Sequence, residues 1–167
     1  MHVLFDQLPP DARLWIFAAE RPLSDTEQGS LLAVVDAFLD QWAAHGAPLA
    51  AARDLRYGQF LFVAVDESNA GASGCSIDAM TRVLAALEHQ LGVQLVDHTP
   101  VLYREGERIA RLDRPAFAER ARRGEVTRDT IVFNNTLSRM ADLQNGKWEV
   151  PAQDSWHARA FFQGAGG

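Results

Sequence analysis

The fold is decided by the stretch Arg53-Asp-Leu-Arg-Tyr-Gly-Gln-Phe-Leu-Phe-Val-Ala-Val65, in the first half of this 167-residue chain. Two runs of strand-forming residues, 53–57 and 59–65, flank Gly58, which predicts either a hairpin or one long bent strand. After Gln59, the second run is continuously apolar. Such a run is typical of a strand with both faces buried, so we expect residues 59–65 to lie at the centre of a sheet.

On the amino-terminal side of this stretch, the sequence predicts one strand and one long helix. Residues 13–19 form an apolar, aromatic-rich run after a proline pair, which indicates a buried strand. Ser24 and Glu27 have the spacing of a capping box, in which each side chain binds the backbone N–H of the other residue. Apolar residues at helical spacing follow, so we expect a helix from about Asp25 to Ala44, ended by His45 and the glycine after it.

On the carboxyl side, the sequence predicts a second helix and then three short strands. Apolar residues step by three and four from Ile77 to Leu91, and Gly92 has the position of a helix-ending glycine. Strand candidates follow at residues 93–96, 100–104 and 108–112.

The order of these elements, βαββα followed by β, predicts an α+β fold. A ferredoxin-like βαββαβ antiparallel sheet requires two crossover helices on one face, and we expect such a core over residues 1–112. Residues 113–167 are expected to form a C-terminal α/β extension that packs on the core to give a single compact unit. The last residues, 164–167, are rich in glycine and should fray.

The composition is that of an ordinary folded protein, with 47% hydrophobic and 23% charged residues. A formal net charge of −6 disfavours binding to nucleic acid or to acidic membranes, and no run of about 18 apolar residues is long enough to cross a bilayer. The one cysteine cannot form an internal disulfide, and no Cys/His cluster has zinc-ligand spacing. We therefore expect a cytoplasmic protein without a metal or cofactor that binds neither nucleic acid nor membrane.

The segment between the central strand and the second helix holds most of the candidate site residues. Asp66 and Glu67 end the strand, whereas Ser73, Gly74 and Cys75 open the helix, so carboxylates and a thiol could meet at one edge of the sheet. A helix N-terminus presents unpaired N–H groups and a partial positive charge, which hold anions and favour the thiolate form of a cysteine. This pattern predicts a small anionic ligand at the start of the helix, or a nucleophilic or sensing role for Cys75.

Two further side chains, Ser76 and Asp78, could either cap the helix or bind the same ligand. A structural interpretation is also open, in which a serine is only the cap and Cys75 is a small apolar plug. A nucleophilic Cys75 needs a base from elsewhere in the chain, and His45, His98 or His157 could supply it if the fold brought one of them close. His45 also has a structural explanation, because the C-terminus of a helix favours a protonated histidine.

Candidate groups also occur in the last third of the chain. Asn134 and Asn135 could line a pocket through their amides, although asparagine pairs also suit turns with left-handed backbone. Trp148 and residues 155–157 form an aromatic cluster that either covers the core or, if exposed, offers a surface for a partner. The arginine-rich stretch 104–123 is interspersed with carboxylates, which indicates a solvated face and not a nucleic-acid site.

A family resemblance rests on five stretches: Trp42–Leu49, Val65–Ser68, Ser73–Asp78 (S-G-C-S-I-D), Phe133–Asn135, and Val150–Ala152 with Ser155-Trp156. Together they resemble a family of small, uncharacterised bacterial proteins over nearly the whole chain, which implies that the S-G-C-S-I-D segment is a recurring pattern. Members are often labelled ABC transporter ATPases, but the chain lacks a G-x-x-x-x-G-K-[ST] phosphate loop, so that label does not describe its mechanism. The family brings no assigned activity. Residues 124–132 separately resemble a stretch of bacterial GYF-like modules that bind partners.

Three functions remain open from the sequence. The first is a ligand-binding or regulatory protein that holds a small anionic group at the start of the second helix. The second is a thiol-dependent enzyme with Cys75 as nucleophile and a distant histidine as base. The third is a non-catalytic interaction protein, acting as a homodimer, that uses the C-terminal aromatic region or a sheet edge.

Overall fold

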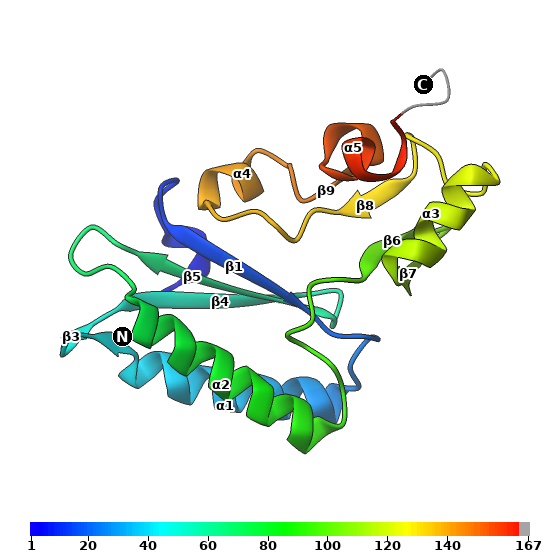
Figure 1. The fold of residues 1–167 in the computed structure, drawn as a ribbon. Coiled ribbons are helices and arrows are strands. Elements are labelled where there is room, and N and C mark those ends of the chain that lie inside the picture. The colour runs from blue at the N-terminus through cyan, green and yellow to red at the C-terminus, as the bar shows by residue number, and fades with distance from the viewer. Residues whose placement is uncertain (164–167) are drawn as a thin grey trace. The chain divides into compact units, whose positions relative to one another are not determined.

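The computed structural model describes residues 1–163, and its first sheet is built around β5 (Phe60–Asp66) (Figure 1). This strand pairs antiparallel with β1 (Arg13–Ala18) on one side and with β4 (Ala50–Arg56) on the other. β1 and β4 therefore run parallel to each other, with β5 between them. Residues 60–65 are all buried, because both faces of the central strand are covered, as the unbroken apolar run predicts.

The turn between β4 and β5 shows that residues 53–65 form a hairpin and not a bent strand. Arg56 pairs with Phe60, so residues 57–59 join the two strands, and Tyr57 and Gly58 in this connection both have left-handed backbone, with φ of 56° and 59°. A Cβ on Gly58 would lie 2.6 Å from Nε2 of Gln28. Glycine is therefore favoured here both by the backbone conformation and by the close approach of a neighbouring side chain.

Two helices, α1 (Asp25–Gln41) and α2 (Gly74–Leu91), lie side by side on one face of this sheet (Figure 1). α1 begins with the predicted capping box of Ser24 and Glu27, and α2 ends at Gly92, whose φ is 66°. The apolar faces predicted from helical spacing meet the sheet. The core between them includes Phe17, Leu31, Val35, Leu39, Leu61, Val63, Val65, Met80, Leu84 and Leu87.

α1 ends three residues earlier than expected, and a small hairpin replaces its last turn. Trp42 caps the helix, and β2 (Ala43–Ala44) then pairs antiparallel with β3 (Ala47–Pro48). His45 and Gly46 form the turn between them, with φ of 52° and 80°. A His-Gly pair suits a helix end and a two-residue turn equally, because both need left-handed backbone at the glycine.

The expected ferredoxin-like βαββαβ sheet is not confirmed, because its last strand does not join β1, β5 and β4. Residues 93–96 form no strand. Two of their N–H groups donate to Glu88 Oε1 at 3.1 Å each, and Gln94 exchanges two hydrogen bonds with Glu20. These contacts use backbone groups that a ladder would need. The coarser expectation, a mixture of helices and antiparallel sheets, is confirmed.

The second sheet has four antiparallel strands in the order β7-β6-β8-β9. Its strands are β6 (Val101–Glu105), β7 (Arg108–Leu112), β8 (Ile131–Phe133) and β9 (Glu149–Pro151). The other elements are η1 (Phe5–Gln7), α3 (Arg114–Arg122), α4 (Met140–Gln144), η2 (Ala152–Asp154) and α5 (His157–Phe161). Tyr103 of β6 packs edge-on against Phe117 of α3, with ring centroids 5.2 Å apart, inside a second apolar core.

The chain divides into two compact units, each containing one of the two larger sheets. The first comprises Met1–Asp97 with Ser138–Ala141, and the second comprises His98–Leu137 with the residues from Asp142 on. The expected packing of residues 1–112 and 113–167 into a single unit stays a prediction, and the expected fraying of residues 164–167 lies outside the described residues. Within residues 1–163, no helix is both long and apolar enough to span a bilayer.

The first unit is discontinuous, because Ser138–Ala141 returns to the outer edge of β1. The N–H of Leu14 donates to the carbonyl oxygen of Ser138 at 3.0 Å, and the N–H of Met140 donates to that of Ala12 at 2.9 Å. A short segment from far along the chain therefore covers one edge of the first sheet.

Candidate functional site

The first turn of α2 is closed by two serine hydroxyls. Ser73 Oγ accepts a hydrogen bond from the N–H of Ser76 at 3.1 Å, and Ser76 Oγ accepts one from the N–H of Ser73 at 2.7 Å. Ser76 Oγ also donates to the carbonyl oxygen of Ser73 at 2.8 Å, and only 3% of Ser76 is exposed. Both hydroxyls are therefore used to cap the helix, which is the structural role left open by the sequence.

The indole of Trp42 fixes the same turn from the segment that follows α1. Its Nε1 donates a buried hydrogen bond to the carbonyl oxygen of Ser76 at 2.8 Å. The ring itself packs against Trp15 and Phe38, with ring centroids 5.9 Å and 5.2 Å away. An aromatic cluster in the core of the first unit thus positions the start of α2.

The two carboxylates that precede α2 are used within the connecting loop. Asp66 Oδ1 accepts from the N–H two residues on, at 3.0 Å, which is the pattern of an Asx turn. Glu67 Oε2 accepts from the N–H of Ala72 at 2.9 Å, and a Cβ on Gly71 would lie 3.0 Å from that oxygen. The other oxygen of Glu67 lies 3.9 Å from Nη1 of Arg139. Glu67 therefore stabilises the conformation of the loop between β5 and α2.

At the start of α2, two backbone N–H groups have no hydrogen-bond partner among the described residues, and one thiol is exposed. The N–H groups of Gly74 and Cys75 precede the first intrahelical bond, and neither has a hydrogen-bond partner among the described residues. Cys75 is exposed, so the interpretation of its side chain as a buried apolar plug is wrong. Apart from the chain neighbours of Gly74 and the backbone of α2 itself, no described atom lies within 4 Å of the position that a Cβ would take on Gly74, and the first turn contains no acidic residue. The positive end of the helix is therefore accessible and not neutralised by its own side chains.

Among the described residues, neither His45 nor Asp78 is hydrogen-bonded to the thiol. His45 is exposed in the β2–β3 turn, beyond α1, which ends at Gln41, so it does not lie at the end of the first helix as expected. Asp78 is exposed on α2, beyond the capping turn. Within residues 1–163, no hydrogen bond joins Cys75 to either side chain, so neither is in contact with it as a general base.

Asn134 and Asn135 lie just after β8 in the second unit, and both amide oxygens serve local contacts. Asn134 Oδ1 accepts from the N–H and from the hydroxyl of Thr136. Asn135 Oδ1 accepts from Nε1 of Trp148 at 2.9 Å. These contacts support the turn interpretation of the asparagine pair, with Asn135 also holding a buried tryptophan.

His157 is buried at the start of α5, with 1% of its surface exposed. Its ring stacks on Trp156 at a centroid distance of 3.9 Å, and its Nδ1 lies 2.8 Å from Oγ of Ser155. Burial of the ring, with a smaller contribution from the Arg114 guanidinium, lowers the pKa of His157 to about 4. The ring is therefore neutral at pH 7 and belongs to the core of the second unit.

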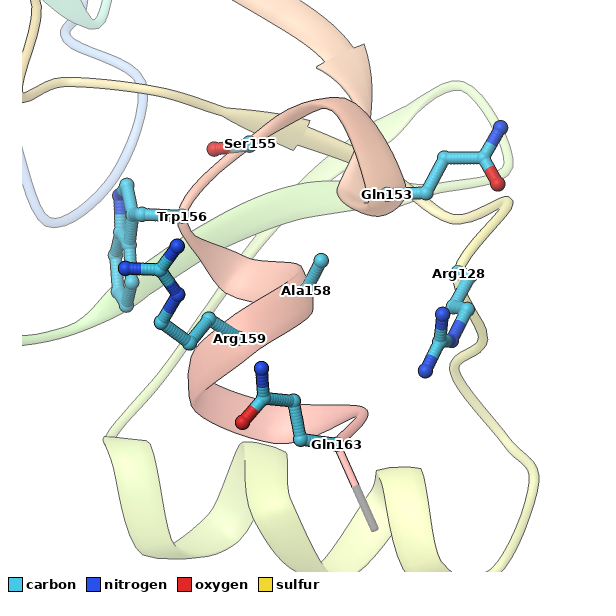
Figure 2. Close-up of a pocket in the computed structure, with 7 residues that line it drawn as sticks. All are labelled: Arg128, Gln153, Ser155, Trp156, Ala158, Arg159 and Gln163. Carbon is cyan, nitrogen blue, oxygen red and sulfur yellow. The ribbon is translucent and has the colours of Figure 1, made fainter. Parts of the chain in front are cut away.

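A cavity of about 490 Å³ in the second unit is the feature that the sequence did not indicate (Figure 2). It is lined by Arg128, Gln153, Ser155, Trp156, Ala158, Arg159 and Gln163. Six of them lie within residues 153–163, in η2, α5 and their flanking residues, whereas Arg128 comes from the segment before β8, and no functional motif links them. Only the folded chain brings two arginines and two glutamines together around one hollow.

Comparison with known proteins adds no assignment. No protein-family model, no curated protein and no solved structure matches the chain. Within residues 1–163, no three or more His, Cys, Asp and Glu side chains are grouped so that they could hold a metal ion. The function therefore rests on the geometry of the two places described above.

Proposed function

We propose that this protein binds a small anionic ligand at the start of α2, as a ligand-binding or regulatory protein. The proposal is carried by the N–H groups of Gly74 and Cys75, which have no partner among the described residues and lie beside an exposed thiol. Two N–H donors at the positive end of an 18-residue helix favour a phosphate or carboxylate group. Because Ser73 and Ser76 are used in the cap, the backbone supplies the binding groups.

The surroundings of these donors support the proposal because they are already fixed. Trp42 holds the carbonyl oxygen of Ser76, and Glu67 holds the N–H of Ala72 in the preceding loop. Donors that are held in place before binding lose little conformational freedom when a ligand arrives, so more of the interaction energy is available for affinity.

The exposure of Cys75 favours a second candidate, a thiol-dependent enzyme or thiol sensor. An exposed side chain is accessible to an electrophile, and the helix N-terminus stabilises a thiolate. No side chain of the described residues is in hydrogen-bond contact with the thiol, so in this candidate the helix end has to favour the thiolate without an adjacent base.

A lone, exposed cysteine suits a reducing cytoplasm, and the S-G-C-S-I-D segment supports membership of the bacterial family that it resembles. The third function, a homodimer built on the C-terminal aromatic region, has less support, because Trp148 is only 4% exposed and its Nε1 already binds Asn135.

The anion proposal is tested by following the backbone amide signals of Gly74 and Cys75 by NMR during titration with inorganic phosphate at constant ionic strength. We expect saturable shifts of these two signals. Ser73→Asn keeps a neutral cap and should bind phosphate like the parent protein. Ser73→Asp also keeps the cap but adds a negative charge beside the donors, so it should lose the shifts. Linear shifts that Ser73→Asp leaves unchanged would overturn the proposal.

The thiol candidate is tested by the rate of Cys75 alkylation with iodoacetamide at neutral pH. Cys75 is the only cysteine, so the same chain unfolded in urea provides the matched control. The candidate predicts faster alkylation in the folded protein than in the unfolded one. An equal or slower rate in the folded protein rules it out. Cys75→Ser should retain the phosphate shifts if anion binding does not need the thiol.

A further inference from the structure

The cavity of the second unit lies between α5, the turn that precedes it and the segment that contains Arg128 (Figure 2). In Figure 2, Arg128 and Gln153 lie to the right of Ala158, Arg159 lies to its left and Gln163 lies below it. Ala158 has a small side chain, so the space between these polar side chains stays open. A volume of about 490 Å³ is within the usual range for small-molecule sites.

The two guanidinium groups give the cavity a positive charge, and no carboxylate among the lining residues that the structure describes offsets it. Arg128 is held at the rim, because its Nη2 donates to the carbonyl oxygen of Phe162, while its other donors stay available. The guanidinium group of Arg159, on α5, has neither a hydrogen bond nor an ion pair to any of residues 1–163. By contrast, Arg122 and Arg123 on α3 both pair with the carboxylate of Glu119.

The cavity is also lined by two side-chain amides, of Gln153 and Gln163, and by the ring of Trp156. The side-chain amides of Gln153 and Gln163 make no hydrogen bond within the described residues, so both can donate to or accept from a ligand. Ser155 Oγ is already in contact with His157 Nδ1, and the ring of Trp156 is stacked on His157. Ser155 and Trp156 therefore shape the wall, whereas the arginines and glutamines are the groups able to recognise a ligand.

We propose that this cavity binds a small organic dianion, with one anionic group at Arg128, the other at Arg159, and the glutamine amides contacting polar groups between them. The planar guanidinium donates paired hydrogen bonds to carboxylate and to phosphate oxygens alike, so both kinds of dianion share this chemistry. Two separated positive groups favour two linked anionic groups over a single anion, because the second contact forms without a further loss of translational freedom. The site is separate from the start of α2 and does not depend on it.

The proposal is tested on the full chain by NMR titration at constant ionic strength, with the indole N–H of Trp156 and the Nε–H of Arg159 as reporters. The probes are succinate as a dicarboxylate, fructose 1,6-bisphosphate as a diphosphate, and acetate as a single anion. We expect saturable shifts with at least one dianion and weaker binding of acetate. Saturation by succinate alone or by the bisphosphate alone identifies the anionic group that the site prefers. Absence of saturation with both dianions overturns the proposal.

Variants separate a specific site from general attraction of anions. Arg159→Gln removes an exposed charge that has no internal partner, so it should leave the fold intact and weaken dianion binding by about tenfold. Arg128→Gln should weaken it similarly, and the backbone spectrum checks that the lost bond to Phe162 has not loosened α5. Arg82→Gln removes an exposed arginine of α2 as the matched control. Equal weakening by Arg82→Gln and Arg159→Gln would also overturn the proposal.

The same titrations distinguish this site from the one at α2. The amide signals of Gly74 and Cys75 report the first site, while Trp156 and Arg159 report the second. Either set can respond without the other, so failure of one proposal leaves the other to be judged on its own signals.

Discussion

The indole Nε1 of Trp42 donates a buried hydrogen bond to the carbonyl oxygen of Ser76, across 34 residues of sequence and 2.8 Å of space. This bond joins the residue that caps the end of α1 to the first turn of α2. The bond therefore connects the aromatic core of the first unit to the helix turn that contains the N–H groups proposed to bind an anion.

Replacing Trp42 with phenylalanine should destabilise the first unit and loosen the start of α2. The carbonyl oxygen of Ser76 would lose its donor, and a buried polar group without a partner costs about 1–3 kcal/mol. Urea unfolding of the parent and variant proteins measures the loss of stability. Hydrogen exchange of the amides of residues 76–80 should also become faster in the variant. Unchanged exchange in this turn would show that the bond does not hold the helix start.

Replacing Gly58 with alanine should cost more stability than the same change at Gly106. Both glycines have positive φ, 59° and 64°, and placing alanine in that conformation costs roughly 1–2 kcal/mol. At Gly58 the new methyl group would also displace the amide of Gln28 from its 2.9 Å hydrogen bond to the carbonyl oxygen of Leu23, at a further cost of about 1 kcal/mol. Gly106 has open space at that position. Chemical denaturation compares the two variants, and equal losses would contradict the steric part of this argument.

Replacing Asp36 with asparagine should remove a paired salt bridge between α1 and β4. Nε and Nη2 of Arg53 each donate to one carboxylate oxygen of Asp36 at 2.8 Å. These hydrogen bonds lower the pKa of Asp36, so its stabilisation is present above the ordinary aspartate pKa and is lost as pH falls through the lowered value. Both side chains are partly exposed, so we expect a loss of about 1 kcal/mol at pH 7.

A double-mutant cycle with Arg53→Gln isolates the Asp36–Arg53 pair. The coupling free energy between the two changes should be close to the loss seen for Asp36→Asn alone, and it should shrink in strong acid. A coupling free energy that stays constant as Asp36 becomes protonated would show that the charge of the carboxylate is not what stabilises the pair.

Replacing His157 with glutamine should flatten the pH dependence of stability on the acid side of neutrality. The pKa of His157 is lowered to about 4 in the folded protein, whereas an unfolded histidine titrates near 6.5. The unfolded chain therefore binds a proton that the folded chain rejects, and stability falls as pH drops from about 6.5 to about 4, by up to about 3 kcal/mol. Unfolding curves across this range measure the difference from the glutamine variant. The other histidines are common to both proteins, so parallel curves would place His157 in a more solvated environment.

Much of the first unit follows from local sequence patterns. The unbroken apolar run over 60–65 predicts a central strand, and the capping box of Ser24 and Glu27 marks where α1 begins. Gly92 marks where α2 ends. These features depend on residues within one or two turns of each other, so periodicity and capping chemistry are enough to predict them.

Features decided by distant contacts were not predictable in the same way. Residues 93–96 have strand-like composition, but several of their backbone groups are hydrogen-bonded to Glu88 and Glu20. Those groups are therefore not available to a neighbouring strand. The S-G-C-S segment was correctly placed at a helix start. Its serines could either face a ligand or cap the helix, because the sequence permits both sets of hydrogen bonds. The cavity around Arg128 and Arg159 has no local signature, because it exists only after α5 has packed.

The return of Ser138–Ala141 to the edge of β1 bears on the order of events during protein synthesis. β1, β5, β4 and both long helices will have left the ribosome while the segment that covers the β1 edge is still untranslated. Until then, the N–H of Leu14 and the carbonyl oxygen of Ala12 lack the partners that they have in the finished protein. The nascent chain must therefore pass through a stage in which one strand edge is open to pairing with other nascent chains.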